Sequence, residues 1–148
     1  MNDPNIRNTV LALCALMGVA ALFFLWIAAP SLGLQSLSRE RQRILVDADA
    51  LRIAVNTARE LDGTVGACGT AEDAKARALA GDTAWRDEPC WRAVGFHPRD
   101  PVIATFFVVP APGGVEVGAY ADLDADGVPF EVRSRGLGVV AVSADGVN

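Results

Sequence analysis

The sequence predicts an α+β protein in which a long N-terminal helix packs on a three- to four-stranded antiparallel sheet. Three observations support this class: an uncharged apolar run, a helical apolar stripe that follows it, and a C-terminal series of strand-like segments joined by short turns. An antiparallel sheet needs a layer over its apolar face, and a preceding amphipathic helix can supply that layer. We therefore expect five regions in order: a short leader over 1–8, a transmembrane helix over 9–30, its amphipathic continuation over 31–62, a variable cysteine-bearing loop region over 63–100 and an antiparallel meander over 101–148.

The apolar run covers residues 9–29 and contains no charged side chain. A helix of this length is roughly 30 Å long, which matches the hydrocarbon core of a bilayer. A cleaved signal peptide is the alternative, but its apolar region is about 7 to 15 residues long. Here Pro30 also stands directly after the position where a cut behind Ala29 would fall. We therefore expect an uncleaved, single transmembrane helix in contact with membrane lipid.

The segment after the apolar run has the periodicity of an amphipathic helix. Apolar residues recur on one of its sides: Leu37, Ile44, Ala48, Leu51, Val55 and Ala58. This stripe is small, so it suits close packing on a sheet better than a coiled coil. A proline between two good helix-forming segments bends a helix more often than it ends it, so Pro30 is the expected bend of one long helix. The arginines on the other faces are expected in solvent or in pairs with acids of the same helix, such as Asp47.

In the rest of the chain, glycines indicate helix ends and turns, and β-branched residues indicate strands. Gly63 and Gly66 indicate the end of the long helix, and a short helix is expected over 71–80. Segments rich in β-branched and aromatic residues then alternate with turns, which predicts an antiparallel arrangement. The expected strands are 102–109, 115–120, 130–133 and 137–142.

Two cysteines, Cys68 and Cys90, lie outside the apolar run, and Cys14 lies within it. Two cysteines with no other thiol nearby predict one disulfide, which requires an oxidising compartment such as a periplasm. The alternative is a pair of unpaired buried thiols in a cytosolic domain. Charge favours that cytosolic placement, because more arginines follow the apolar run than precede it. The orientation in the membrane is thus left open by charge alone.

Composition excludes several function classes. The chain has 148 residues, 13 Lys+Arg against 18 Asp+Glu, and a net charge of -5, so a nucleic-acid-binding surface is not expected. Phosphate loops of the G-x-x-x-x-G-K type and nucleophile motifs of the G-x-S-x-G type are both absent from the sequence. His97 is the single histidine, and one imidazole does not define a catalytic set. We expect no enzyme activity.

Three carboxylates stand at alternate positions of a short turn, at Asp122, Asp124 and Asp126, followed by Gly127. Oxygen ligands on a tight glycine-containing loop suit a hard cation, so the turn is a candidate Ca²⁺ site. A complete EF-hand loop would have glutamate at its twelfth position, where this chain has Arg133. The alternative is a solvated acidic turn between two strands, since water screens the repulsion between exposed carboxylates.

The order of these features resembles type IV pilin-like proteins, the minor pilins and pseudopilins. The resemblance covers the apolar helix with its proline, the amphipathic continuation, the cysteine-bearing loop, the segment Trp91–Pro98 (WRAVGFHP), a hydrophobic hairpin and Ala121–Gly127 (ADLDADG). It implies a structural subunit that packs its N-terminal helix against other pilin-like subunits in a type IV pilus or a type II-like secretion assembly. It also implies a bacterial cytoplasmic membrane location, with the C-terminal head in the periplasm or on an extracellular filament.

The N-terminus departs from the family pattern. The family has a glycine at the end of the leader and a glutamate at the fifth mature position, whereas counting back from Pro30 places Asn8 and Leu13 there. This prepilin N-terminus is therefore degenerate. The alternative function is a fixed single-pass membrane protein whose pilin-like, extracytoplasmic head is an accessory binding module and does not polymerise.

Overall fold

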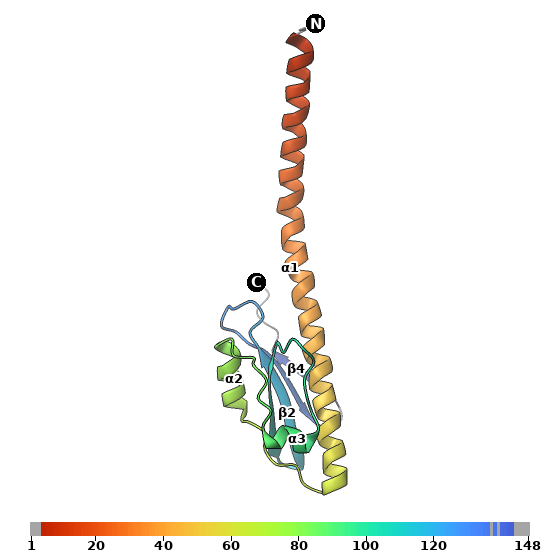
Figure 1. Cartoon of the computed structure of the whole chain (residues 1–148), viewed down its shortest axis with the longest axis vertical. Coiled ribbons are helices and arrows are strands. Elements are labelled where there is room, and N and C mark those ends of the chain that lie inside the picture. Colours follow the sequence, from red (N-terminus) through yellow and green to blue (C-terminus); the bar gives the residue numbers. More distant parts are fainter. Residues whose placement is uncertain (1–3, 137, 139, 144–148) are drawn as a thin grey trace. The chain divides into compact units, whose positions relative to one another are not determined.

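The computed structural model describes residues 4–136, 138 and 140–143 (Figure 1). Side chains are described from residue 35 onward to 136, at 138, and at positions 14, 16–20 and 22–24. This part of the chain forms, in order, α1 (Pro4–Asp62), α2 (Ala71–Leu79), α3 (Pro89–Val94), β1 (Thr105–Ala111), β2 (Gly114–Ala121), β3 (Phe130–Arg135) and β4 (Val140–Ser143). The chain divides into an N-terminal unit, Met1–Ser38, and a C-terminal unit, Arg39–Asn148. Helices followed by an antiparallel sheet confirm the α+β class.

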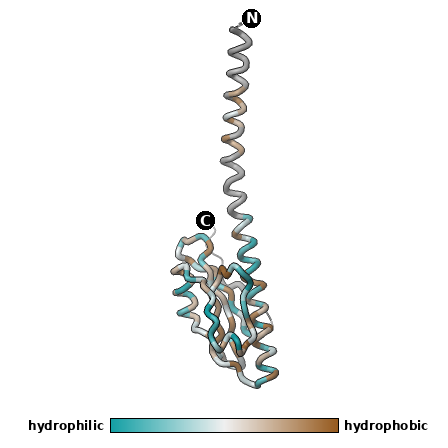
Figure 2. Tube along the Cα trace, viewed as in Figure 1, coloured by the Kyte–Doolittle hydropathy of each residue, from teal (hydrophilic) through white to brown (hydrophobic). Residues whose placement is uncertain are grey.

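The N-terminal unit consists of the first part of α1. Its described apolar side chains are exposed, with Leu16, Val19 and Phe24 at 73%, 68% and 78%. In Figure 2 short stretches of this helix are coloured toward the hydrophobic end of the scale, and the helix is teal where the hydrophilic residues 39–43 follow. Among the described residues, none of the helices has the length and the apolar content that a membrane crossing requires. Most side chains of the predicted span 9–30 lie outside the described residues, and the transmembrane helix stays a prediction.

The predicted continuity between the apolar and amphipathic segments is confirmed, because α1 runs unbroken from Pro4 to Asp62. Pro30 lies within this helix. Its side chain is outside the described residues, so the predicted bend there stays a prediction. Residues 1–3 of the predicted leader also lie outside the described residues. The helix ends where the glycine signal places it: Gly63 has a φ of 77°, and its N–H donates to the Arg59 carbonyl at 2.9 Å.

The sheet of the C-terminal unit is a simple antiparallel meander in the order β1-β2-β3-β4. Each expected strand overlaps an observed one. The first was expected over 102–109, whereas β1 begins three residues later, at Thr105, and continues through Pro110 to Ala111. Proline fits there because Pro110 is near the end of a strand at the edge of the sheet, where a missing N–H costs little. The last strand is shorter than expected, covering Val140–Ser143. Residues 137 and 139 of the expected strand are outside the described residues.

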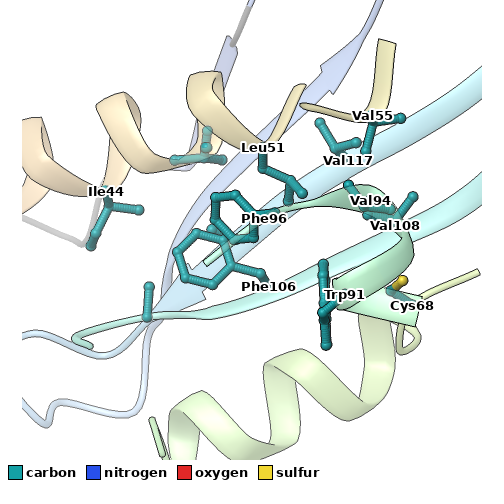
Figure 3. Packing of buried hydrophobic residues seen from close by; sticks show 14 of the residues in the cluster. Ile44, Leu51, Val55, Cys68, Trp91, Val94, Phe96, Phe106, Val108 and Val117 are labelled. Atoms are coloured by element: carbon teal, nitrogen blue, oxygen red, sulfur yellow. The ribbon is translucent and has the colours of Figure 1, made fainter. Parts of the chain in front are cut away.

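One face of the sheet is covered by the second half of α1, as the apolar stripe predicts. Ile44, Leu51 and Val55 are at most 2% exposed, and Figure 3 shows them pointing toward the strands and toward α3. They belong to the same buried cluster as Val117 and Val132 of the sheet. The remaining stripe residues Ala48 and Ala58 are also buried, whereas Leu37 is half-buried. Packing of the helix on the sheet is therefore confirmed for the C-terminal unit.

The other face of the sheet carries a second, smaller cluster under α2. Phe107 and Tyr120 stack there with ring centroids 5.7 Å apart, and Ala74 and Ala78 of α2 cover them. Thr105 fixes the helix to the sheet by donating from its hydroxyl to the Ala74 carbonyl at 2.6 Å. The expected short helix over 71–80 is thus confirmed, and it forms the layer that covers this face of the sheet.

Residues 63–100 are more ordered than the variable loop region that we expected. They contain α3, which the sequence analysis missed, with Pro89 at its first turn and Gly95 (φ 71°) at its end. Trp91 on α3 packs on Trp85 with ring centroids 5.1 Å apart. A six-residue helix with two aromatic neighbours has too few turns to show a periodicity in the sequence.

The charged residues of α1 only partly follow the expected pairing within the helix. Arg52 and Asp49 do pair, at 2.9 Å. Asp47, however, is 5% exposed and accepts from Arg99 Nε at 2.8 Å. The expectation of a helical partner for Asp47 is wrong, because the segment after α3 crosses this position and excludes water from it. Arg43 holds the same segment by donating to the carbonyls of Arg99 and Pro101 at 2.7 and 2.8 Å.

Gly118 in β2 should not tolerate a larger residue. A Cβ at this position would lie 2.4 Å from Cζ of Phe107 and 2.6 Å from the Val132 carbonyl oxygen. We expect Gly118→Ala to lower the free energy of unfolding by about 1–3 kcal/mol through overpacking, measured by urea unfolding of the full-length chain in detergent. Gly66→Ala is the matched control, since its Cβ would meet no atom within 4 Å. Equal stability of the two variants would contradict the packing of Phe107 on Gly118.

Candidate functional site

The acidic turn is the connection between β2 and β3. Ala121 and Phe130 are register partners at the end of the ladder, so the intervening residues leave and re-enter the sheet at the same point. Ala125 (φ 59°) and Gly127 (φ 82°) both adopt the left-handed conformation within this connection. Two such residues in a short connection make a sharp turn, in agreement with the predicted role of Gly127.

The structure brings the three predicted carboxylates together. One oxygen from each of Asp122, Asp124 and Asp126 lies within 4.8 Å of the other two. Their other contacts are to backbone N–H groups of the same turn: Asp122 Oδ2 accepts from Gly127 at 3.2 Å, and Asp126 Oδ1 accepts from Val128 at 2.7 Å. Asp122 Oδ1 is buried and has no hydrogen-bond partner among the residues that the structure describes. A buried oxygen without a donor is the kind of atom that a cation satisfies.

These residues fit a calcium ion in part. Carboxylate oxygens are the ligands that Ca²⁺ prefers, but the ion takes about 6–8 of them, so backbone carbonyls and water would have to complete the shell. Arg133, which stands where an EF-hand has its bidentate glutamate, bonds instead to Glu116 and Glu131. The turn would therefore hold calcium weakly, in the range of about 10⁻⁴–10⁻³ M that open sites of this kind show.

The predicted cysteine pair is also brought together. Cys68 precedes α2 and forms a bridge with Val108 of β1, with N–H to carbonyl distances of 2.8 and 2.9 Å. Cys90 lies on α3 and is half-buried, whereas Cys68 is fully buried. Burial, and then the hydrogen bond with the Cys90 thiol, raise the pKa of Cys68. Both residues are free thiols in this structure. The disulfide stays a prediction, and it would join the segment before α2 to α3.

His97 packs beside Trp85 and its own neighbour in the chain. Its Nδ1 is 2.7 Å from the Pro98 carbonyl oxygen, and its ring contacts Trp85 with centroids 5.4 Å apart. These contacts are those of a histidine that packs against an aromatic side chain at the surface.

A buried ion-pair network on the α2 side of the sheet escaped the sequence analysis. Glu116 of β2 is 3% exposed and accepts from Arg133 Nη1 at 2.8 Å and from Arg135. Arg133 also donates to Tyr120 Oη at 2.7 Å and stacks over the Phe107 ring at 5.7 Å. The network caps the aromatic pair on this face. The network follows from the register that places Glu116 opposite Arg135. A strand register joins two distant segments, so the local spacing of residues could not predict this pair.

The network has a consequence for pH stability. Burial raises the pKa of Glu116, but hydrogen bonds from Arg135 and Arg133 outweigh it and leave this pKa below its usual range. A carboxyl whose pKa is lowered on folding stabilises the fold above its ordinary pKa. That contribution is lost as the pH falls through the lowered value.

Comparisons with known proteins found no match for this chain. No family model matches it, and neither a curated protein nor a solved structure is significantly similar to it. The class that the coordinates define is an α+β protein with a long N-terminal helix and a four-stranded antiparallel meander.

We predict that the acidic turn binds Ca²⁺ and that each carboxylate contributes. Asp122→Asn, Asp124→Asn or Asp126→Asn should weaken Ca²⁺ binding by roughly tenfold or more, because each removes a charged ligand. Isothermal titration calorimetry of the full-length chain measures the affinity. The control is Asp87→Asn, an exposed aspartate outside the turn. Absence of calcium binding at millimolar concentration would show that the turn is simply solvated.

Proposed function

We propose that this chain is a membrane-anchored, pilin-like structural subunit, a minor pilin or pseudopilin of a type IV pilus or a type II-like secretion assembly. In this role it performs no catalysis. Residues 9–30 anchor it in the bacterial cytoplasmic membrane until assembly, and the C-terminal unit lies in the periplasm or on the filament. The oxidising compartment is the one in which Cys68 and Cys90 would join.

The observation that carries this proposal is a pair of exposed apolar residues on the side of α1 that faces away from the sheet. Opposite the stripe that packs on the sheet, Val46 and Ile53 are 44% and 52% exposed, and Leu61 near the end of the helix is 79% exposed. Val46 and Ile53 are seven residues apart and are therefore on one side of the helix. Apolar side chains at this heptad spacing give another copy of the helix a place to pack.

The N-terminal unit supports the same role. Its described side chains between residues 16 and 24 are apolar and highly exposed. In a bilayer they would contact lipid, and in a filament they would contact the equivalent helices of other subunits. One helix can serve both purposes, because lipid and an apolar helix surface are similar environments for these side chains.

A charged residue on the exposed side of α1 should prevent assembly without unfolding the chain. We expect Ile53→Glu to lower recovery of the protein in sheared filaments by roughly tenfold or more, since a buried, unpaired carboxylate costs several kcal/mol per interface. The matched control is Leu79→Glu, which places the same charge on an exposed leucine of α2. Immunoblots of the sheared and membrane fractions give the distribution. Recovery of the wild-type chain in the membrane fraction alone would contradict the proposal.

A second candidate function has specific support in Asn8 and Leu13, which replace the glycine and glutamate of the family pattern. It is a fixed single-pass protein whose C-terminal unit is an accessory binding module. Mass spectrometry of the native chain distinguishes the two: loss of the first eight residues supports a processed subunit, and an intact N-terminus supports the fixed module. The same spectrum, taken after alkylation, shows whether Cys68 and Cys90 are joined.

A further inference from the structure

The C-terminal unit has a cleft lined by two arginines at the end of the sheet where α1 stops, and Glu60 lines the adjoining hollow. The cleft has a volume of about 260 Å³ and lies between α1, the turn that joins β1 to β2, and the end of β3. Asn56 and Arg59 contribute from α1, Gly113 and Gly114 from the turn, and Arg135 from β3. The two arginines are the charged side chains among its lining residues.

Arg59 is available to a ligand. Among the described residues its guanidinium has no ion-pair or hydrogen-bond partner. It lies close to the turn: a Cβ on Gly114 would be 3.1 Å from Nη1 of Arg59. The absence of a side chain at Gly114 therefore leaves room for the arginine beside the backbone.

Arg135 is partly available as well. Its Nε donates to the buried Glu116, yet its side chain is 72% exposed. Glu116 also bonds to Arg133, so its charge is shared between two guanidinium groups. A guanidinium has five N–H donors, and those of Arg135 that do not contact Glu116 can bind a carboxylate.

The acidic turn lies at the opposite end of the same sheet. The cleft is beside the Ala111–Gly114 register pair, and the acidic turn is beside the Ala121–Phe130 pair. β2 connects the two ends, and its length separates them by about 23 Å. One end of the unit thus carries three clustered carboxylates, and the other carries two arginines at a cleft.

We propose that the Arg59–Arg135 cleft of one copy binds the Asp122–Asp126 turn of a second copy, so that C-terminal units stack end to end. The two surfaces differ, so the contact is heterologous, and repetition of such a contact gives an open, helical assembly. This inference rests on the proposed function, because it supplies a contact between subunits of a filament. A bound calcium ion would neutralise the same carboxylates, so the contact requires the turn without calcium.

Site-specific photocrosslinking tests the contact in the full-length chain in its native cells. A benzophenone amino acid replaces Asn56, which lines the cleft, or Ile53, which lies on the exposed side of α1. The membrane and filament fractions are collected in EDTA and then irradiated, so that the turn is free of calcium when the crosslink forms. Crosslinked peptides are identified by mass spectrometry. We expect the Asn56 probe to reach residues 122–128 of a second copy.

Charge reversal gives the quantitative arm of the test. Arg59→Glu should reduce the Asn56 crosslink roughly tenfold, because it places like charges together. The same chain carrying Asp124→Arg as well should recover part of the crosslink, since one Arg–Asp pair of each contact then has its charges exchanged. Lys75→Glu on α2 is the control for net charge and should leave the crosslink unchanged.

The two probes separate the two proposals. Crosslinks between copies from Ile53 together with none from Asn56 would overturn the end-to-end contact and leave the filament proposal standing. Crosslinks from Asn56 to another protein, or no recovery in the Arg59→Glu, Asp124→Arg chain, would also overturn it. If neither probe joins two copies, both proposals fail.

Discussion

Burial of the α1 stripe on the antiparallel sheet is the contact from which the rest of the C-terminal unit is built. A meander of short strands has an apolar face that cannot be left in water, and α1 covers it along Ile44, Leu51 and Val55. Each such side chain contributes about 1.5–3 kcal/mol when it is fully buried. Ala48 in the middle of the stripe is small, so the helix backbone can approach the strands. The same contact positions Asp47 and Arg43, which then hold the segment around Arg99.

The two faces of the sheet are closed by different physical means. The α1 face is mainly apolar, with the Asp47–Arg99 ion pair beside the stripe, whereas the α2 face combines a small aromatic cluster with ion pairs. Phe107 lies directly on Gly118, and Arg133 covers the ring while bonding to the buried Glu116. Two arginines around one carboxylate compensate for its burial, and Arg135 then extends toward the end of the sheet. The polar side of the fold therefore determines the charge of the cleft at that end.

Local patterns predicted the elements whose signal is local. The helical spacing from Ile44 to Ala58 predicted the buried stripe, and the alternate spacing of the three aspartates predicted their clustering. The pairs that depend on distant segments could not be predicted. The partner of Asp47 is 52 positions away at Arg99, and the partners of Glu116 follow from a strand register that no single segment encodes. α3 was missed because six residues hold too few turns to show a period.

The central claim is that α1 has two different sides, one that stabilises the C-terminal unit and one that stays exposed in the monomer. Urea unfolding of the full-length chain in detergent, followed by tryptophan fluorescence, tests it most directly with Leu51→Ala and Ile53→Ala. Leu51 is 0% exposed and Ile53 is 52% exposed. We expect Leu51→Ala to lower the free energy of unfolding by about 2–5 kcal/mol and Ile53→Ala to change it by less than about 1 kcal/mol. Similar losses for the two variants would contradict the division of α1 into a packing side and a free side.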